Sequence, residues 1–243
     1  MAEAANNYAK TIAIRQAIVT KVYERVGKWF GVATEYFEGD FNKEMAEKLK
    51  GVPEEHIASP KPSIAAPAMQ QLAYSLDEPD LKEMYISLLA TASDNRSSED
   101  AHPSFVEVIK QLSADEIGYL SSVLTNRGML PIIKYVAELP DGQGHSVLLK
   151  HVLRMSVVAT GDPVEVSRLP AFVDNWVRLG LVEVDYSSFM VGDFYDSWAL
   201  ARPEALRLQA DLASDQTLTF NKGFIRATDF GLAFAKAVGV TTG

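Results

Sequence analysis

Histidine is the residue type in this sequence best suited to acid–base or metal chemistry, and its four copies are widely spaced. They are His56, His102, His145 and His151. The last two are six residues apart, a spacing that does not place two side chains on one face of a helix. The chain has no cysteine, so thiolate nucleophiles and thiolate zinc sites are excluded. The sequence therefore predicts no metal site.

The sequence also lacks the short motifs that mark common active sites. It contains no phosphate-binding loop ending in Gly-Lys-Ser/Thr, no nucleophile elbow, no two-histidine metalloprotease helix and no calcium loop. Gly142-Gln-Gly144 precedes a predicted helix and could hold a phosphate, but it follows Pro140-Asp141 and is better explained as a turn. We expect a protein without catalytic residues and without a cofactor.

His102 directly precedes Pro103, a residue type that is common in the first turn of a helix. In this position an imidazole can accept a backbone amide hydrogen bond and cover the helix end. A histidine acts as a base only when a partner group orients it, and the spacing identifies no such partner. We interpret His102 as a helix-end residue and, together with Ser104, as a candidate partner contact.

Aromatic and acidic residues are interleaved in residues 189–198, FMVGDFYDSW. Asp193 and Asp196 could recruit a cation. The neighbouring rings instead favour a packed loop or a loop that faces a partner, because aromatic side chains often anchor protein interfaces. The candidate contacts in this segment are Phe189, Phe194, Tyr195 and Trp198.

A net charge of −9 limits the partners of this 243-residue chain, in which 47% of residues are apolar. Residues 1–50 carry 8 basic and 7 acidic residues, so the excess negative charge lies in the remainder. An acidic surface repels phosphate backbones, which argues against nucleic-acid binding. The first residues lack the pattern of a signal peptide, and no apolar run reaches the roughly 18 residues that span a bilayer. We expect a cytoplasmic protein.

Apolar periodicity predicts a helical N-terminal half. Residues 8–37 form an amphipathic segment that could pack into the core or touch an anionic membrane through its basic face, and most such helices pack. Further helices are expected over residues 41–49, from Pro67 and from Pro79.

The C-terminal half predicts both helices and strands. Helices are expected over residues 146–158 and 170–179, followed by a strand over 181–184. Two β-rich arms around Asn221-Lys222-Gly223 predict a hairpin over residues 217–227. Thr228 would then cap a last helix.

This order of elements looks like a winged helix, with residues 170–179 as the recognition helix, 217–227 as the wing and 185–216 as an insertion. The candidate nucleic-acid contacts in such a module are Arg178, Lys222 and Arg226. Because a DNA reader needs more basic residues than these, we favour a module for protein contact.

The predicted fold is mainly α, with a helical N-terminal part followed by a winged-helix-like α/β C-terminal module. The predicted domains are amphipathic helices in residues 1–50, a proline-rich connector in 51–68, a central helical domain in 69–125 and a winged-helix-like domain in 126–243.

Residues 51–120 resemble the bacterial abortive-infection alpha family, and the C-terminal part carries further similarity. The residues that carry the resemblance are the prolines before residue 68, Leu88-Leu89-Ala90, Asp94, His102-Pro103-Ser104-Phe105, Leu112-Ser113, RLGLVEV at 178–184 and ATDFGLAFAKAV at 227–238. The resemblance implies a role in defence against bacteriophage and brings no catalytic residues.

Together these observations predict a sensor or adaptor that acts through protein contacts, with a companion defence protein or a phage component as its partner. A homo-oligomer is compatible with this expectation. Two alternatives remain open at this stage: a DNA-binding winged-helix transcriptional regulator, and a membrane-acting effector that uses residues 8–37 for peripheral contact.

Overall fold

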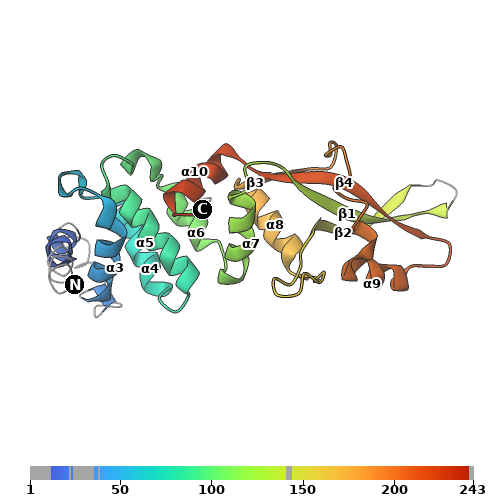
Figure 1. Ribbon diagram of the computed structural model, residues 1–243, viewed down its shortest axis with the longest axis horizontal. Helices are drawn as coiled ribbons and strands as arrows, with labels where there is room; N and C mark the ends of the chain where they lie inside the picture. Colours follow the sequence, from blue (N-terminus) through green and yellow to red (C-terminus); the bar gives the residue numbers. More distant parts are fainter. Residues whose placement is uncertain (1–11, 22, 24–35, 38, 141–143, 241–243) are drawn as a thin grey trace. The chain divides into compact units, whose positions relative to one another are not determined.

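The computed structural model describes residues 12–21, 23, 36–37, 39–140 and 144–240 (Figure 1). These residues form two compact units. The first contains the described residues up to Gly118 together with those from Ala233 onward, and the second contains Tyr119–Leu232. The chain therefore passes between units within two helices, α7 (Ala114–Leu124) and α10 (Asp229–Ala237).

The first unit is helical and is built around α5 (Pro79–Ser93), in which ten of 15 residues are buried. The helix expected from Pro79 is thus confirmed, and the one expected over 41–49 is α3. The other elements are α3 (Asp40–Lys48), α4 (Pro62–Tyr74), α6 (Ser104–Lys110) and the 3₁₀ turns η1 (Leu49–Gly51), η2 (Glu54–His56) and η3 (Ser98–Asp100). Helices α3, α4 and α6 all pack against α5, and Figure 1 shows α4 beside it.

The helix expected to start at Pro67 starts five residues earlier, at Pro62. Pro62 occupies the first turn, where a missing backbone N–H leaves no bond unmade. Pro67 lies inside α4 and cannot donate to the carbonyl of Ser63. The expected start is wrong because either proline suits a helix N-terminus locally, and burial of Ile64 and Ala65 favours the longer helix.

The amphipathic segment 8–37 is described only at residues 12–21, 23 and 36–37. Residues 12–21 are helical, and Val19 and Tyr23 are buried. The described part therefore packs into a core. The rest of the segment lies outside the described residues, so the alternative of a peripheral membrane contact stays a prediction. Within the described part of the chain, no helix combines the length and apolarity needed to cross a bilayer.

The second unit contains a four-stranded antiparallel sheet in the order β2-β1-β4-β3. Its elements are β1 (Leu130–Glu138), β2 (His145–Leu153), α8 (Leu169–Arg178), β3 (Val182–Asp185), η5 (Ala199–Ala201), α9 (Pro203–Asp211) and β4 (Thr217–Ala227). Helix α8 and strand β3 confirm the helix expected over 170–179 and the strand expected over 181–184. Thr228 caps α10 as expected, because its Oγ1 accepts the backbone N–H of Gly231 at 2.9 Å.

The helix predicted over residues 146–158 is wrong, because residues 145–153 form strand β2 and pair with β1. The register shifts twice along this pairing. Ile133 faces Val152 and Tyr135 faces Leu149, so one residue of β1 is opposite two of β2. Such bulges interrupt the period-two alternation by which a strand is recognised, and the remaining apolar pattern then matches a helix.

The hairpin predicted over residues 217–227 is also wrong, because this segment is the single strand β4. Gly223 lies within the strand rather than in a turn. A Cβ atom at Gly223 would lie 2.4 Å from the carbonyl oxygen of Asp185 and 2.6 Å from the ring of Tyr186. Glycine is required here by the close approach of the chain that follows β3.

The winged-helix expectation is not confirmed. Helix α8 followed by β3 fits it, but the wing at 217–227 is absent from this part of the described chain because β4 runs straight through it. About half of the described residues are helical, and the sheet they form is a four-stranded antiparallel one.

The predicted insertion, residues 185–216, belongs to the second unit and contains a buried ion pair. The guanidinium of Arg202 donates to Glu204 at 3.0 and 2.8 Å. It also donates to the carbonyl oxygens of Met155, at 3.0 Å, and Val164, at 2.8 Å. Because these bonds satisfy a charge that would otherwise be buried alone, the pair fixes the start of α9 to the loop that follows β2.

Candidate functional site

His102 lies at the start of α6, as the sequence predicts. Its Nδ1 accepts the backbone N–H of Ser104 at 3.1 Å and lies 2.6 Å from the Ser104 hydroxyl. The ring contacts Phe105 edge-on, with a centroid distance of 5.9 Å. The expected hydrogen bond from a backbone amide to the imidazole is therefore confirmed. His102 and Ser104 hydrogen-bond with each other at an exposed helix end.

Tyr195 and Trp198 are buried, so these two candidates belong to the core and not to a contact surface. The Tyr195 hydroxyl donates to the carbonyl of Gly223 at 2.8 Å and accepts the backbone N–H of Met190 at 3.0 Å. The indole N–H of Trp198 donates to the carbonyl of Phe194 at 2.6 Å. The sequence allows either a packed loop or a loop that faces a partner, and both of these rings are packed.

Three large apolar side chains that precede these anchors in the sequence are exposed, and we call them the apolar patch: Phe189, Val191 and Phe194. Their exposed fractions are 56%, 90% and 44%. Gly192 has a φ of +130°, a backbone conformation that other residues rarely adopt. The sequence predicts the two phenylalanines of this patch and misses Val191, because exposure of a single valine has no sequence signal.

Acidic residues border the apolar patch. Asp193 is exposed and forms no ion pair with any residue that the structure describes. Asp196 pairs with Lys222 at 2.7 Å, and the ammonium of Lys222 lies 5.5 Å from the centroid of the Tyr195 ring. Asp185, the last residue of β3, accepts hydrogen bonds from the backbone N–H and the hydroxyl of Ser187. The patch is therefore apolar with a negative edge.

The three candidate nucleic-acid contacts all have partners inside the protein. Arg178 donates to the side chain of Asn175 at 2.6 Å. Lys222 pairs with Asp196, and Arg226 pairs with Glu183. The two carboxylates lower the positive charge that Lys222 and Arg226 could offer to phosphate groups, whereas the neutral amide of Asn175 leaves the charge of Arg178 unchanged.

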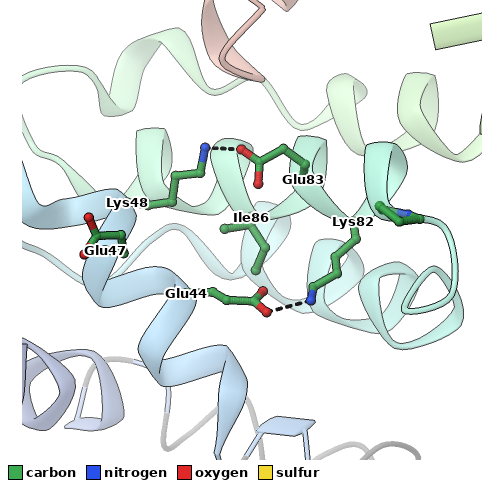
Figure 2. Close-up of a pocket in the computed structure, with 7 residues that line it drawn as sticks. Glu44, Glu47, Lys48, Lys82, Glu83 and Ile86 are labelled. Atoms are coloured by element: carbon green, nitrogen blue, oxygen red, sulfur yellow. Dashed lines mark hydrogen bonds and ion pairs between the residues drawn. The ribbon is translucent and has the colours of Figure 1, made fainter. Parts of the chain in front are cut away.

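The cleft between α3 and α5, in the first unit, has a volume of about 520 Å³. Figure 2 shows Ile86 between two ion pairs that join the helices, Lys48 with Glu83 and Lys82 with Glu44. The second pair has an N–O distance of 2.6 Å. The two ion pairs connect α3 with α5. Because they neutralise both lysines, the cleft offers no concentrated charge of one sign.

Tyr36 strengthens one side of this cleft. Its hydroxyl donates to Glu44 at 2.7 Å, and the ammonium of Lys82 lies 4.9 Å from its ring centroid. Burial and the Glu44 carboxylate both raise the pKa of Tyr36 above its ordinary value. The three side chains therefore form a local network, and Tyr36 stays protonated at neutral pH.

A second group of titratable side chains, which the sequence does not reveal, surrounds His151 in the second unit. His151 is buried on β2 with a φ of +58°. Its Nε2 lies 3.1 Å from Asp174, and its Nδ1 lies 3.2 Å from the hydroxyl of Tyr186. The Tyr186 hydroxyl also accepts the backbone N–H of His151 at 3.0 Å. The bulge in β2 is what turns this histidine toward its two partners.

Burial lowers the pKa of His151, although the nearby Asp174 carboxylate acts in the opposite direction. Burial raises the pKa of Tyr186 to about 12. The cavity beside His151 has a volume of about 20 Å³, which is room for one water molecule. The arrangement resembles an acid–base chain, but this cavity is too small for a substrate.

The described residues contain no group of three or more histidine, aspartate or glutamate side chains placed to hold a metal ion. Asp193 and Asp196, the pair considered for a cation, belong to no such group.

The fold is thus a two-unit helical protein with an antiparallel sheet and an exposed apolar loop. The chain belongs to the abortive infection alpha family, whose sequence profile matches residues 33–238. A comparison with curated proteins finds no match. Among solved structures, an uncharacterized protein from the hydrocarbon-degrading marine bacterium Alcanivorax borkumensis SK2 is similar over 60% of this chain and 96% of its own, with 12% identity and a TM-score of 0.37. Family membership suggests a role in phage defence.

Proposed function

We propose that this protein acts in phage defence as a sensor or adaptor, and that it works by contacting another protein through the apolar patch rather than by catalysing a reaction. The observation that carries the proposal is the exposure of Phe189, Val191 and Phe194 within one short loop. Large apolar groups gathered on a surface commonly mark protein contacts.

The construction of the loop supports this proposal. Tyr195 and Trp198 hold it from inside through hydrogen bonds to the backbone of Met190, Phe194 and Gly223. A loop that is held in one conformation before binding loses less conformational entropy when a partner docks. Buried aromatic anchors beneath exposed aromatic residues therefore suit a recognition surface.

The proposal can be tested by phage plating on a strain that the native locus protects. The double variant Phe189→Ser, Phe194→Ser should lose protection, because it removes the two rings while leaving the buried anchors in place. Leu206→Ser, which changes an exposed leucine on α9, is the matched control and should retain protection. Immunoblotting and circular dichroism should show equal abundance and equal helix content for all proteins. Full protection by the double variant would overturn the proposal.

A photo-crosslinking amino acid at Val191 gives a second measurement. During infection it should join the protein to one specific partner band, and the same amino acid at Leu206 should not. Identical band patterns from the two positions would contradict recognition through the patch.

A further inference from the structure

The segment that carries the apolar patch is strongly acidic. Residues 185–216 contain six acidic residues and two basic ones. Both basic residues are already neutralised: Arg202 by the buried Glu204, and Arg207 by Glu165 at 2.6 Å. Neither arginine is therefore available to neutralise the exposed carboxylates of the segment.

A cation that contacts this segment from β4 is also engaged. Lys222 pairs with Asp196, and its ammonium lies over the rings of Tyr195 and Phe220, at 5.5 and 6.0 Å from their centroids. A lysine held in this way is a poor partner for Asp193, which stays exposed between Val191 and Phe194 and has no ion pair within the described chain.

We infer that the apolar patch binds a basic amphipathic segment of its partner, in which apolar side chains lie next to lysine or arginine. This inference rests on the proposed function and adds the chemistry of the partner to it. The apolar side chains of such a segment would cover Phe189, Val191 and Phe194, while its cations would meet Asp193 at the edge. Opposite charges at the edge of an interface mainly speed association and select the partner, and their effect is screened by salt.

Synthetic peptides provide the probe. The first peptide is amphipathic, with leucines on one face and lysines beside them. The second keeps the leucines and replaces each lysine by glutamate. The third keeps the lysines and replaces each leucine by serine. Binding is measured by fluorescence anisotropy with the full chain at low and high salt. We expect the leucine–lysine peptide to bind about tenfold more tightly than the other two at low salt, and this advantage to shrink at high salt.

Variants then locate the site. Asp193→Lys should weaken binding of the leucine–lysine peptide several-fold. Asp162→Lys, an equal change of charge at another exposed position of the second unit, should not. The Phe189→Ser, Phe194→Ser protein should lose the preference for leucine over serine. All of these positions are exposed, so thermal unfolding should be unchanged in each variant.

Two results would overturn the inference: equal binding of the lysine and glutamate peptides, or equal effects of the changes at Asp193 and Asp162. Self-association that disappears in the double phenylalanine variant would also overturn it, because a second copy would then occupy the patch. The proposed function fails separately, when the double variant still protects against phage. Loss of protection without any charge preference would leave the proposed function standing and remove only this inference.

Discussion

Two serines of α5 are buried, but only one of them is hydrogen-bonded. Ser93 donates to the carbonyl of Leu89 at 2.8 Å and lies 2.7 Å from the hydroxyl of Tyr23. The hydroxyl of Ser87 has no hydrogen-bond partner in the described structure. A buried hydroxyl without a partner has lost its water without compensation, so Ser87 reduces stability while Ser93 contributes to it.

The substitution Ser87→Ala should therefore raise the free energy of unfolding by about 1 kcal/mol, and Ser93→Ala should lower it by about the same amount. Urea denaturation followed by circular dichroism measures both. The pair is matched, because each change removes one hydroxyl from the same helix. A loss of stability in Ser87→Ala would show that this hydroxyl has a partner.

His151 makes stability depend on pH. Its pKa in the folded protein is lowered by burial, so the unfolded chain binds a proton more readily as the pH falls through about 6.5. The contribution of His151 to folding is consequently complete above that pH and is lost below it. Asp174 reduces the effect, because its carboxylate favours the protonated ring.

The substitution His151→Asn should remove this part of the pH dependence, since asparagine tolerates a positive φ and does not titrate. Between about pH 7.5 and about pH 5.5, the wild type should lose more unfolding free energy than the variant. Asp174→Asn should make the loss steeper than in the wild type. Parallel curves for wild type and His151→Asn would exclude the assignment.

At the scale of elements, Gly223 decides whether β3 and β4 can pair as they do. Gly223→Ala places a methyl group 2.4 Å from the backbone oxygen of Asp185. Backbone cannot move aside as a flexible side chain can, so we expect a loss of about 2 to 3 kcal/mol in the free energy of unfolding.

Gly118 supplies the control, because a Cβ atom there meets nothing within 4 Å. Gly118→Ala in α7 should raise stability by roughly 0.5 to 1 kcal/mol through helix propensity alone. Urea denaturation again measures both variants. Equal effects of the two glycine substitutions would contradict the close contact at Gly223.

The elements that the sequence predicts correctly are those whose signals are local. Proline at the start of α5, the apolar period of α3 and α8, and the Thr228 cap all act within a few residues along the chain. Strand β2 was not predictable in this way, because its bulges are defined by the pairing with β1. The same holds for β4, where glycine is needed at position 223 because the backbone of Asp185, which is distant in the sequence, lies too close for a side chain.

The candidate site follows the same division. The aromatic composition of residues 189–198 indicates a loop with a special role, and Phe189 and Phe194 are indeed exposed. Which rings point inward depends on the sheet beneath them, and this is why the assignment of Tyr195 and Trp198 as partner contacts is wrong. The His151 group was missed because Asp174 and Tyr186 come from separate elements and carry no common motif.

At the scale of the whole molecule, charge is the basis on which we favour a protein partner over DNA. The chain carries a net charge of −9, and the three cations considered for phosphate contact are bonded to Asn175, Asp196 and Glu183. Freeing any of them would break an existing bond. Binding to phosphates would therefore gain little from counterion release, which supplies most non-specific affinity.

We accordingly expect no saturable binding to a fluorescently labelled DNA duplex at physiological salt, even at the micromolar concentrations at which ordinary DNA-binding domains associate without sequence preference. Fluorescence anisotropy at several salt concentrations measures this. Asp196→Asn is the informative variant, because it releases Lys222 and lowers the negative charge. If the weakness of the wild type is electrostatic, this variant should bind slightly better at low salt. Salt-dependent binding by the wild type that is lost in Arg178→Ala or Lys222→Ala would instead favour a DNA-reading module over a surface for proteins.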